Sequence, residues 1–239
     1  MSNQLEKIKE LIERRATARM GGGDKAIAKQ HEKGKYTARE RIAMLLDEGS
    51  FVEIGGAITA RSTDFNLQNA PTPGDGVLTG YGLIDGNLVY VYCQNPEVLH
   101  GTIGEMHAKK IANVYDMAMK MGAPVIGLID CAGMRLQEAT DALYGFGNLY
   151  LKQTMASGVI PQITAVFGTC GGGMAIIPAL TDFTFIESQK GKMFVNSPNA
   201  LDGNYTEKCD TSAAAFQSEE TGLVDFTGSE EDILSQIRS

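Results

Sequence analysis

The chain has 239 residues, of which 43% are hydrophobic and 21% are charged. These values are ordinary for a globular protein with one sizeable core. The formal net charge of −8 argues against nucleic acid or an anionic membrane as the main partner, although a local basic patch could still bind a small polyanion. We find no apolar run long enough for a signal peptide or for the roughly 20 residues of a membrane helix.

The cysteines lie far apart in the sequence and form no C-x-x-C pair, which disfavours a zinc ribbon and predicts no metal site. Reduced thiols in a cytoplasmic protein are therefore the expectation. The four are Cys93, Cys131, Cys170 and Cys209.

The first 48 residues are predicted to be helical and rich in charge. Apolar residues at helical spacing predict a helix over residues 4–19, which ends at the three glycines 21–23. Residues 24–48 form a second, basic helical region, in which the loop 31–35 (HEKGK) concentrates positive charge and Thr37 is a suitable N-cap for the helix after it. We call residues 31–35 the basic loop.

The next segment predicts strands. Residues 51–58 form the first, and residues 61–75, which are polar with two prolines, form a loop. Two β-rich runs at 76–83 and 87–93 flank Asp85-Gly86, which is a strong hairpin signal.

From residue 103 onward, helices alternate with buried strands, and this recurrence predicts a layered α/β fold of ββα-like units. The last helix of the chain looks peripheral. Helices are expected at 103–121, 137–157, 174–180 and about 229–238, and strands at 125–129, 163–167, 183–187 and 193–195.

Two glycine-containing loops, 130–135 (DCAGMR) and 168–174 (GTCGGGM), each follow an apolar strand and open a helix. That order points backbone N–H groups at one place, and glycine lets another group come close to the backbone. Such a site suits an anion, either a phosphate or the oxyanion of a thioester enolate. For one such loop alone, tight strand-to-helix packing explains the glycines equally well. No nucleotide-binding motif or G-x-S-x-G elbow accompanies them.

Taken in order, six segments resemble the N-terminal half of the biotin-dependent acyl-CoA carboxyltransferase family. That family includes propionyl-CoA carboxylase β chains, methylmalonyl-CoA carboxyltransferases and related decarboxylase subunits. The matching stretches are 21–46, 74–86, 104–111 (GEMHAKKI), 130–138 (DCAGMRLQE), 156–162 and 170–183 (CGGGMAIIPALTDF).

The resemblance implies a crotonase-like (ClpP/crotonase) α/β fold, a spiral of ββα units, and a mechanism. Carboxyl is exchanged between N1′ of carboxybiotin, carried on a partner protein, and the α-carbon of a coenzyme A thioester. The enolate-like anions are held by backbone N–H groups in oxyanion holes, so no side-chain base is required. The N-terminal half takes the acyl-CoA, and a C-terminal domain takes biotin.

The resemblance also implies residue roles and partners. Gly172 and Gly173 would donate N–H groups to the enolate, and Gly133 and Met134 would add a donor. The expected partners are acyl-CoA, a C-terminal-domain carboxyltransferase subunit and a biotin carrier protein, in a homo- and hetero-oligomer that meets a membrane only through its complex. The residues expected to bind coenzyme A are Lys33, Lys35, Arg39, Ala132, Arg135 and Gly171.

Several of these side chains have a structural alternative. The basic residues at 33–39 could form a solvated face, and Arg135 could pair with Asp130 or Glu138. His107 is more typical of helix packing than of catalysis. Cys131 and Cys170 are more typical of small-residue packing.

The sequence also departs from the family. Residues 131–134 read Cys-Ala-Gly-Met where the family usually has Ser-Gly-Gly-Ala, and the match fades after 198. Full family chains carry a second domain of similar size. A separate subunit must then supply the biotin half, or the sequence is truncated or a degenerate relative. We expect a single domain over 1–239, with a helical extension at 1–48, a crotonase-like core at 49–228 and a C-terminal helix at 229–239.

Two other functions remain open. One is a crotonase-type hydratase or isomerase, which needs carboxylates near the thioester and for which Glu138 is a candidate. The other is a non-catalytic acyl-CoA-binding or assembly subunit.

Overall fold

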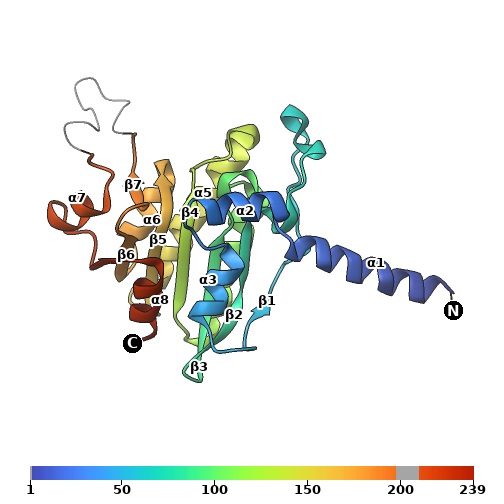
Figure 1. The fold of residues 1–239 in the computed structure, drawn as a ribbon, viewed down its shortest axis with the longest axis horizontal. Helices are drawn as coiled ribbons and strands as arrows, with labels where there is room; N and C mark the ends of the chain where they lie inside the picture. The colour runs from blue at the N-terminus through green and yellow to red at the C-terminus, as the bar shows by residue number, and fades with distance from the viewer. Residues whose placement is uncertain (1, 198–209) are drawn as a thin grey trace.

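A computed structural model describes residues 2–197 and 210–239, so Cys209 lies outside the described residues. An eight-stranded sheet runs through the molecule in the order β1-β2-β3-β4-β5-β6-β8, and β7 pairs with β5 (Figure 1). The first three strands pair antiparallel and the others parallel. The strands are β1 Val52–Glu53, β2 Val77–Ile84, β3 Asn87–Gln94, β4 Val125–Cys131, β5 Gln162–Gly171, β6 Phe183–Glu187, β7 Lys192–Phe194 and β8 Phe226–Gly228.

Helices cover both faces of this sheet, and α1 projects away from it (Figure 1). Within 2–197 and 210–239, none of the helices combines the length and the apolar character needed to cross a bilayer. The helices are α1 Ser2–Arg19, α2 Asp24–Glu32, α3 Ala38–Leu45, α4 Glu105–Met121, α5 Ala139–Ala156, α6 Ile176–Ala179, α7 Ala214–Glu219 and α8 Glu230–Arg238.

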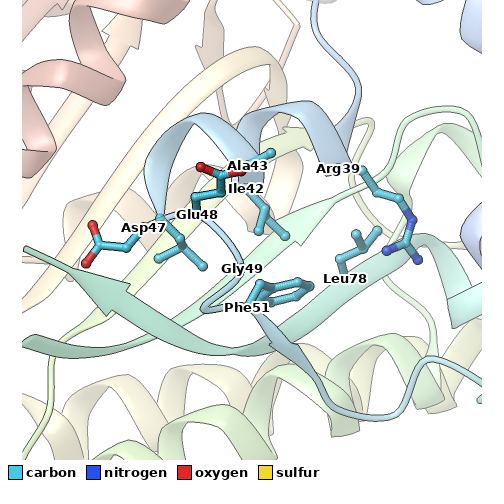
Figure 2. Close-up of a pocket in the computed structure, with 9 residues that line it drawn as sticks. Arg39, Ile42, Ala43, Asp47, Glu48, Gly49, Phe51 and Leu78 are labelled. Atoms are coloured by element: carbon cyan, nitrogen blue, oxygen red, sulfur yellow. The ribbon is translucent and has the colours of Figure 1, made fainter. Parts of the chain in front are cut away.

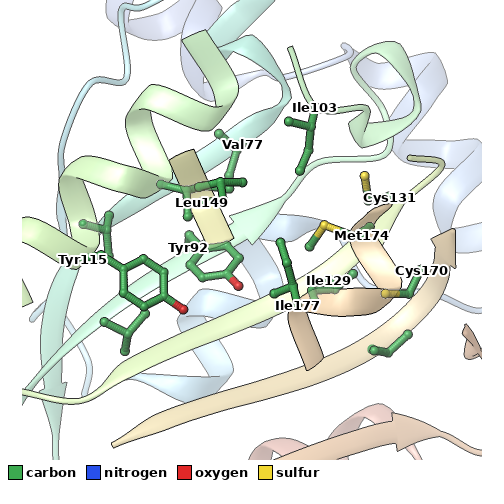
Figure 3. Close-up of a cluster of buried hydrophobic side chains, with 14 of the residues drawn as sticks. Val77, Tyr92, Ile103, Tyr115, Ile129, Cys131, Leu149, Cys170, Met174 and Ile177 are labelled. Carbon is green, nitrogen blue, oxygen red and sulfur yellow. The ribbon is translucent and has the colours of Figure 1, made fainter. Parts of the chain in front are cut away.

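The sheet separates two hydrophobic clusters because alternate strand residues face opposite sides. On β3, Val91 packs with residues of α3 and α8, whereas Tyr92 packs with residues of α4 and α5. Figure 3 shows part of the second cluster, where Tyr92 and Tyr115 lie near Leu149. The pair α4 and α5 therefore covers one face, and the pair α3 and α8 covers the other.

The hairpin and the two local helix signals are confirmed. Asp85 and Gly86 both have positive φ, 49° and 80°, as the tight turn favoured by Asp-Gly requires. Thr37 caps α3 in a reciprocal capping box with Glu40. Gly122 ends α4 in the left-handed conformation with φ 67°.

Other boundaries were predicted wrongly. The strand expected at 51–58 is confined to two residues, because Gly55 turns the chain with φ 69°. By contrast, the loop expected inside the region 24–48 is confirmed, because the chain leaves α2 at Glu32 and turns at Gly34 with φ 64° before α3 begins. Strand β5 continues to Gly171 because β7 pairs with its end. The expected helix 174–180 is consequently a 3-10 turn, Gly172–Ala175, followed by the one-turn α6, and α7 and β8 were not predicted.

The C-terminal helix is not peripheral. Ile233 and Leu234 of α8 are buried in the cluster beneath α3. Glu230 accepts two hydrogen bonds from the fully buried Arg41 of α3, at 2.7 and 3.0 Å. Arg41 also pairs with Asp130 at 3.4 Å and lies over the Phe167 ring, so it joins α3, α8 and the end of β4.

We expect Arg41→Met to lower the free energy of unfolding by about 3–5 kcal/mol, because it leaves Glu230 buried without its cation. Urea unfolding followed by circular dichroism measures the loss. Arg39→Met is the matched control: Arg39 pairs with Glu53 in a partly exposed position, and its loss should cost about 1 kcal/mol or less. Equal losses in the two variants would contradict the role given to Arg41.

Candidate active site at the ends of β4 and β5

The two glycine loops leave the sheet side by side. Strands β4 and β5 are parallel neighbours, and their register pairs Cys131 with Cys170 at the ends from which the loops begin. A Cβ added to Gly133 would lie 3.1 Å from the carbonyl oxygen of Gly171. The structure therefore brings the two loops into contact, and glycine is what permits so close an approach.

In the second loop, Gly172 faces open space. Its φ is 63°, and a Cβ built there would meet no atom within 4 Å among residues 2–197 and 210–239, the adjoining residues aside. Its neighbours are enclosed: a Cβ on Gly171 would lie 3.1 Å from the Phe194 ring, and one on Gly173 would lie 2.7 Å from Tyr150 Oη. The Tyr150 hydroxyl of α5 also donates to the carbonyl of Gly173 at 2.7 Å, so α5 holds this loop in place.

The first loop is tied to the segment that precedes α4. Ile103 N–H donates to Gly133 O, and Arg135 N–H donates to Ile103 O, both at 2.9 Å. Gly133 N–H donates to Cys131 Sγ at 3.3 Å. Ile103 and Met134 face each other in a short parallel β-bridge. The bonds of this bridge are made by Gly133 and Arg135, on either side of Met134, so the N–H of Met134 points away from Ile103. It donates to no group within 2–197 and 210–239. Of the two donors expected here, Met134 is thus the one whose N–H has no acceptor among the described residues. The N–H of Ala132 is bonded to His100 O.

Arg135 fixes the far end of this loop from inside the protein. Its side chain is 1% exposed and its Nη1 contacts Asp75 Oδ1 at 2.6 Å and Glu138 Oε1 at 2.8 Å. Its Nη2 donates to Thr102 O at 2.8 Å. The internal ion pair suggested as the alternative role of Arg135 is therefore what the structure shows. Arg135 pairs with Glu138, as suggested, and with Asp75 rather than Asp130. The guanidinium does not face solvent, where a phosphate would approach.

Asp130, at the near end of the loop, belongs to the buried cluster of Arg41. It also pairs with Lys35, whose side chain is 12% exposed. The carboxylate of Asp130 and the ammonium of Lys35 occupy the space that a side chain at Gly168 would need. Lys35 therefore forms an internal ion pair with Asp130, whereas the sequence predicted a contact with a phosphate.

The other two basic residues differ from each other. Arg39 makes a two-fold contact with Glu53, at 3.0 and 3.2 Å, and its Nε donates to Arg19 O at 2.9 Å, so it holds α1 and β1 together. Lys33, at the end of α2, is exposed. Of the three, Lys33 alone keeps an ammonium group available to a ligand in the described part of the chain.

His107 and Lys110 of α4 lie behind the first loop; the sequence analysis predicted helix packing for His107 and did not single out Lys110. Burial, with Arg135 and Lys110 nearby, holds the pKa of His107 well below its usual value, so its neutral ring packs between Asp75 O at 2.9 Å and Gln94. Burial lowers the pKa of Lys110 to about 8, and its Nζ donates to the carbonyls of Gly74 and Val77. The packing role expected for His107 is what the structure shows.

The cysteines beside the loops are packing residues, as predicted. Figure 3 shows Cys131, Cys170 and Met174 at one end of the buried cluster. Burial raises the pKa of Cys131 to about 12. Its thiol is therefore protonated and is not a nucleophile.

A cavity of about 250 Å³ lies elsewhere, beside α3 (Figure 2). Its walls include Ile42, Leu46, Phe51 and Leu78, and Arg39 lies at one end. It contains no residue of either glycine loop and is separate from the candidate active site.

Comparison with known proteins agrees with this geometry. A family model described as "Carboxyl transferase domain" matches residues 29–238, and the chain belongs to that family. The chain is 44% identical to the methylmalonyl-CoA decarboxylase subunit alpha of Veillonella parvula over 242 residues, which cover 100% of this chain and 48% of that relative. It is 50% identical to the propionyl-CoA carboxylase beta chain of Roseobacter denitrificans over 194 residues, 81% of this chain and 38% of that one.

Among solved structures, a transcarboxylase 12S with hydrolysed methylmalonyl-coenzyme A bound superposes with a TM-score of 0.92 at 34% identity. The match covers 97% of this chain and 46% of that chain. The fold is therefore crotonase-like, as the sequence predicted. The chain spans about half the length of the relatives that it matches.

Lys33 and Lys35 of the basic loop should respond differently to substitution, because Lys35 is paired with Asp130 and Lys33 is exposed. Lys35→Met should lower the free energy of unfolding by about 2 kcal/mol, because it removes a charged partner of the buried Asp130. Lys33→Met should leave stability unchanged and weaken coenzyme A binding about threefold, as expected for one exposed contact with a phosphate.

Urea unfolding and isothermal titration calorimetry with coenzyme A measure the two effects. Lys7→Met, on the exposed α1, is the control for a general loss of positive charge. If Lys33→Met and Lys7→Met bind coenzyme A equally well, the basic loop is only a solvated face.

Proposed function

We propose that this chain is the acyl-CoA-binding half of a biotin-dependent carboxyltransferase. It would transfer carboxyl between carboxybiotin and the α-carbon of an acyl-CoA, as part of an acyl-CoA carboxylase, transcarboxylase or decarboxylase. The observation that carries the proposal is the meeting of the two loops, where the open backbone at Gly172 lies beside a first loop whose Met134 N–H is free. Membership of the carboxyl transferase family supports it.

The chemistry needs a place for negative charge rather than a strong base. When carboxyl leaves or joins the α-carbon of a thioester, electron density moves onto the thioester oxygen. Fixed N–H donors stabilise that oxyanion without reorganising, and they act most strongly where water is excluded. Gly172 and Gly173 on one side and Met134 on the other are the donors that we propose. The positive φ of Gly172, with no Cβ, leaves the space that the thioester needs.

Carboxybiotin, attached to its carrier protein, would supply the carboxyl group when it is bound, and in the reverse direction biotin would accept it. We propose that the second carboxyltransferase domain holds biotin against the thioester. Relatives such as the Veillonella subunit are about twice as long as this chain, and their additional part would correspond to that domain. The acyl-CoA stays on the half described here, with Lys33 near its nucleotide end.

A hydratase or isomerase is the weaker alternative, because Glu138, the carboxylate that such an enzyme would use here, is bonded to other groups of the protein. Glu138 is buried, pairs with Arg135 at 2.8 Å and accepts the N–H of Glu105 at 2.6 Å. Both contacts are internal, so this carboxylate is engaged with the protein rather than placed beside a substrate. A non-catalytic acyl-CoA-binding subunit is distinguished by the experiments that follow.

We expect Gly172→Ala to lower kcat/KM for carboxyl transfer about 100-fold in the assembled enzyme, because the new Cβ displaces the thioester from the donors. The left-handed backbone costs an alanine about 1–2 kcal/mol of stability, and a valine more. Gly49→Ala is the matched control, since Gly49 has φ 71° and equally open surroundings but lies outside both loops. Equal activity in the two variants would refute the oxyanion role.

The purified chain alone should show no carboxyl exchange between biotin and an acyl-CoA, although it should bind coenzyme A. Adding the chain that carries the second domain should restore exchange. Chromatographic analysis of methylmalonyl-CoA and propionyl-CoA after incubation measures both states. Comparable turnover without the second chain would contradict the split site, and coenzyme A binding without turnover in the complex would favour a non-catalytic subunit.

A further inference from the structure

Lys110 of α4 is a buried cation that grips one turn of the chain. Its side chain belongs to a residue only 4% exposed, and its Nζ donates to the carbonyl oxygens of Gly74, at 2.7 Å, and of Val77. The stem of the lysine lies against Gly55, where an added Cβ would come within 3.3 Å of Lys110 Cε. Lysine is almost never buried this deeply unless its charge is engaged. The two carbonyl groups of the turn are what engage it here.

The turn at 74–77 needs this support. Gly74, Asp75 and Gly76 follow one another with φ of 62°, 49° and 73°. The left-handed conformation is unfavourable for Asp75, which has a Cβ. A run of such residues continues neither a helix nor a strand, so its shape depends on contacts from the surrounding elements. Lys110 makes two of these contacts.

The same turn holds the far end of the first glycine loop. Asp75 accepts from Arg135 Nη1 at 2.6 Å through its carboxylate, and from His107 Nδ1 at 2.9 Å through its carbonyl. The backbone N–H of Arg135 donates to Ile103 O at 2.9 Å. Arg135 is the residue directly after Met134, so a displacement of the turn is passed to the Met134 peptide through one side chain.

We infer that Lys110 is a positioning residue for the oxyanion site. Its ammonium group fixes the 74–77 turn, the turn fixes Arg135, and Arg135 fixes the N–H of Met134. The role rests on the proposed function, which makes that N–H a donor to the enolate oxygen. Lys110 acts through the turn and takes no part in the reaction itself.

Positioning by an ammonium group makes the loop sensitive to pH. Burial lowers the pKa of Lys110 to about 8. Glu53 of β1 and Asp75 of the turn favour the charged form, and Arg39 of α3 opposes it; His107 of α4 is neutral, because its own pKa is well below the usual value. Hydrogen bonds from a charged donor are roughly twice as strong as those from a neutral one. Loss of the proton above about pH 8 therefore loosens the grip on the turn.

The contribution of Lys110 to stability runs in the opposite direction. Its pKa is lower in the folded chain than the ordinary value of 10.5, so between about pH 8 and that value the unfolded chain binds more protons. The free energy of unfolding therefore gains from this group as the pH rises. Relief of the buried charge outweighs the weaker hydrogen bonds, which is what a lowered pKa means. A fall in activity without a matching loss of fold is thus the signature of positioning.

The first measurement is carboxyl transfer by the assembled enzyme as a function of pH. Lys110→Met keeps the stem and removes the charge, and should lower kcat at about pH 7 about tenfold with little change in KM, because the donors act in the transition state. The wild-type kcat should decline above about pH 8, and the profile of Lys110→Met should lack that decline. Lys109→Met is the matched control, since Lys109 lies on the same helix but is half exposed and paired with Glu105 at 2.5 Å. It should keep the wild-type profile.

The second measurement is hydrogen exchange in the full chain, which reads the first loop without any reaction. The N–H groups of Ala132, Gly133 and Arg135 are hydrogen-bonded. Lys110→Met should raise their exchange rates about tenfold at constant pH, as expected for local loosening, and Lys109→Met should not. If Lys110→Met does not fold, Lys110→Arg takes its place in the activity series, because arginine keeps its charge at every pH used. Its kcat should not decline above about pH 8.

Three results would overturn the role given to Lys110. The pH profiles of the wild type and of Lys110→Met, or of Lys110→Arg, could coincide. The exchange rates of the first loop could be unchanged in Lys110→Met. The loss of wild-type activity could simply follow a loss of folded protein, measured by circular dichroism over the same pH range.

The two measurements also separate this role from the proposed function. If the loop loosens in Lys110→Met but the assembled wild type transfers no carboxyl group, the function is wrong and the positioning role stands. If the wild type and Lys110→Met transfer carboxyl equally well at every pH, the positioning role is wrong and the function stands.

Discussion

The candidate site depends on charges buried at both ends of the first glycine loop. At its near end, Asp130 is paired with Lys35 and Arg41, and at its far end Arg135 is paired with Asp75 and Glu138. A buried ion without its partner is very costly, so these pairs tolerate little displacement. Pairs of this kind add little net stability compared with apolar residues of similar size. What they contribute here is position, because four residues of backbone are held between two fixed points.

This arrangement explains why the titratable groups near the loops are not available for acid–base work. Arg135, Glu138, His107 and Lys110 are all occupied by internal contacts. The groups that remain open belong to the backbone, at Gly172 and Met134. Backbone N–H groups cannot change protonation near neutral pH and need no reorganisation when charge develops on a ligand. A site that uses them must be built accurately, and the buried ion pairs provide that accuracy.

Local signals in the sequence were sufficient for local features, and not for these pairs. The Asp85-Gly86 turn and the Thr37 capping box each depend on residues within a few positions of one another, and both were predicted correctly. Arg135 and Asp75 are 60 positions apart, and nothing in the spacing of charges reveals that the fold brings them together. The same reason accounts for β5, since Gly168–Gly171 resembles a turn until β7, some 20 residues later, extends the sheet. Asp75 and Lys110 both lie in segments that match the family, which was the only available sign of their importance.

The half-site is therefore built but open. Its loops are positioned by contacts within this chain, so a partner is not needed to shape the donors. Residues 2–197 and 210–239 provide no cover over Gly172, where a Cβ would meet none of their atoms within 4 Å apart from the adjoining residues. Water at that position would weaken each N–H contact with an oxyanion, because the interaction falls as the local dielectric rises. In the proposed complex, the domain that brings biotin would also exclude this water. Helix α5 holds one side of this half-site in place, since the Tyr150 hydroxyl donates to the carbonyl of Gly173.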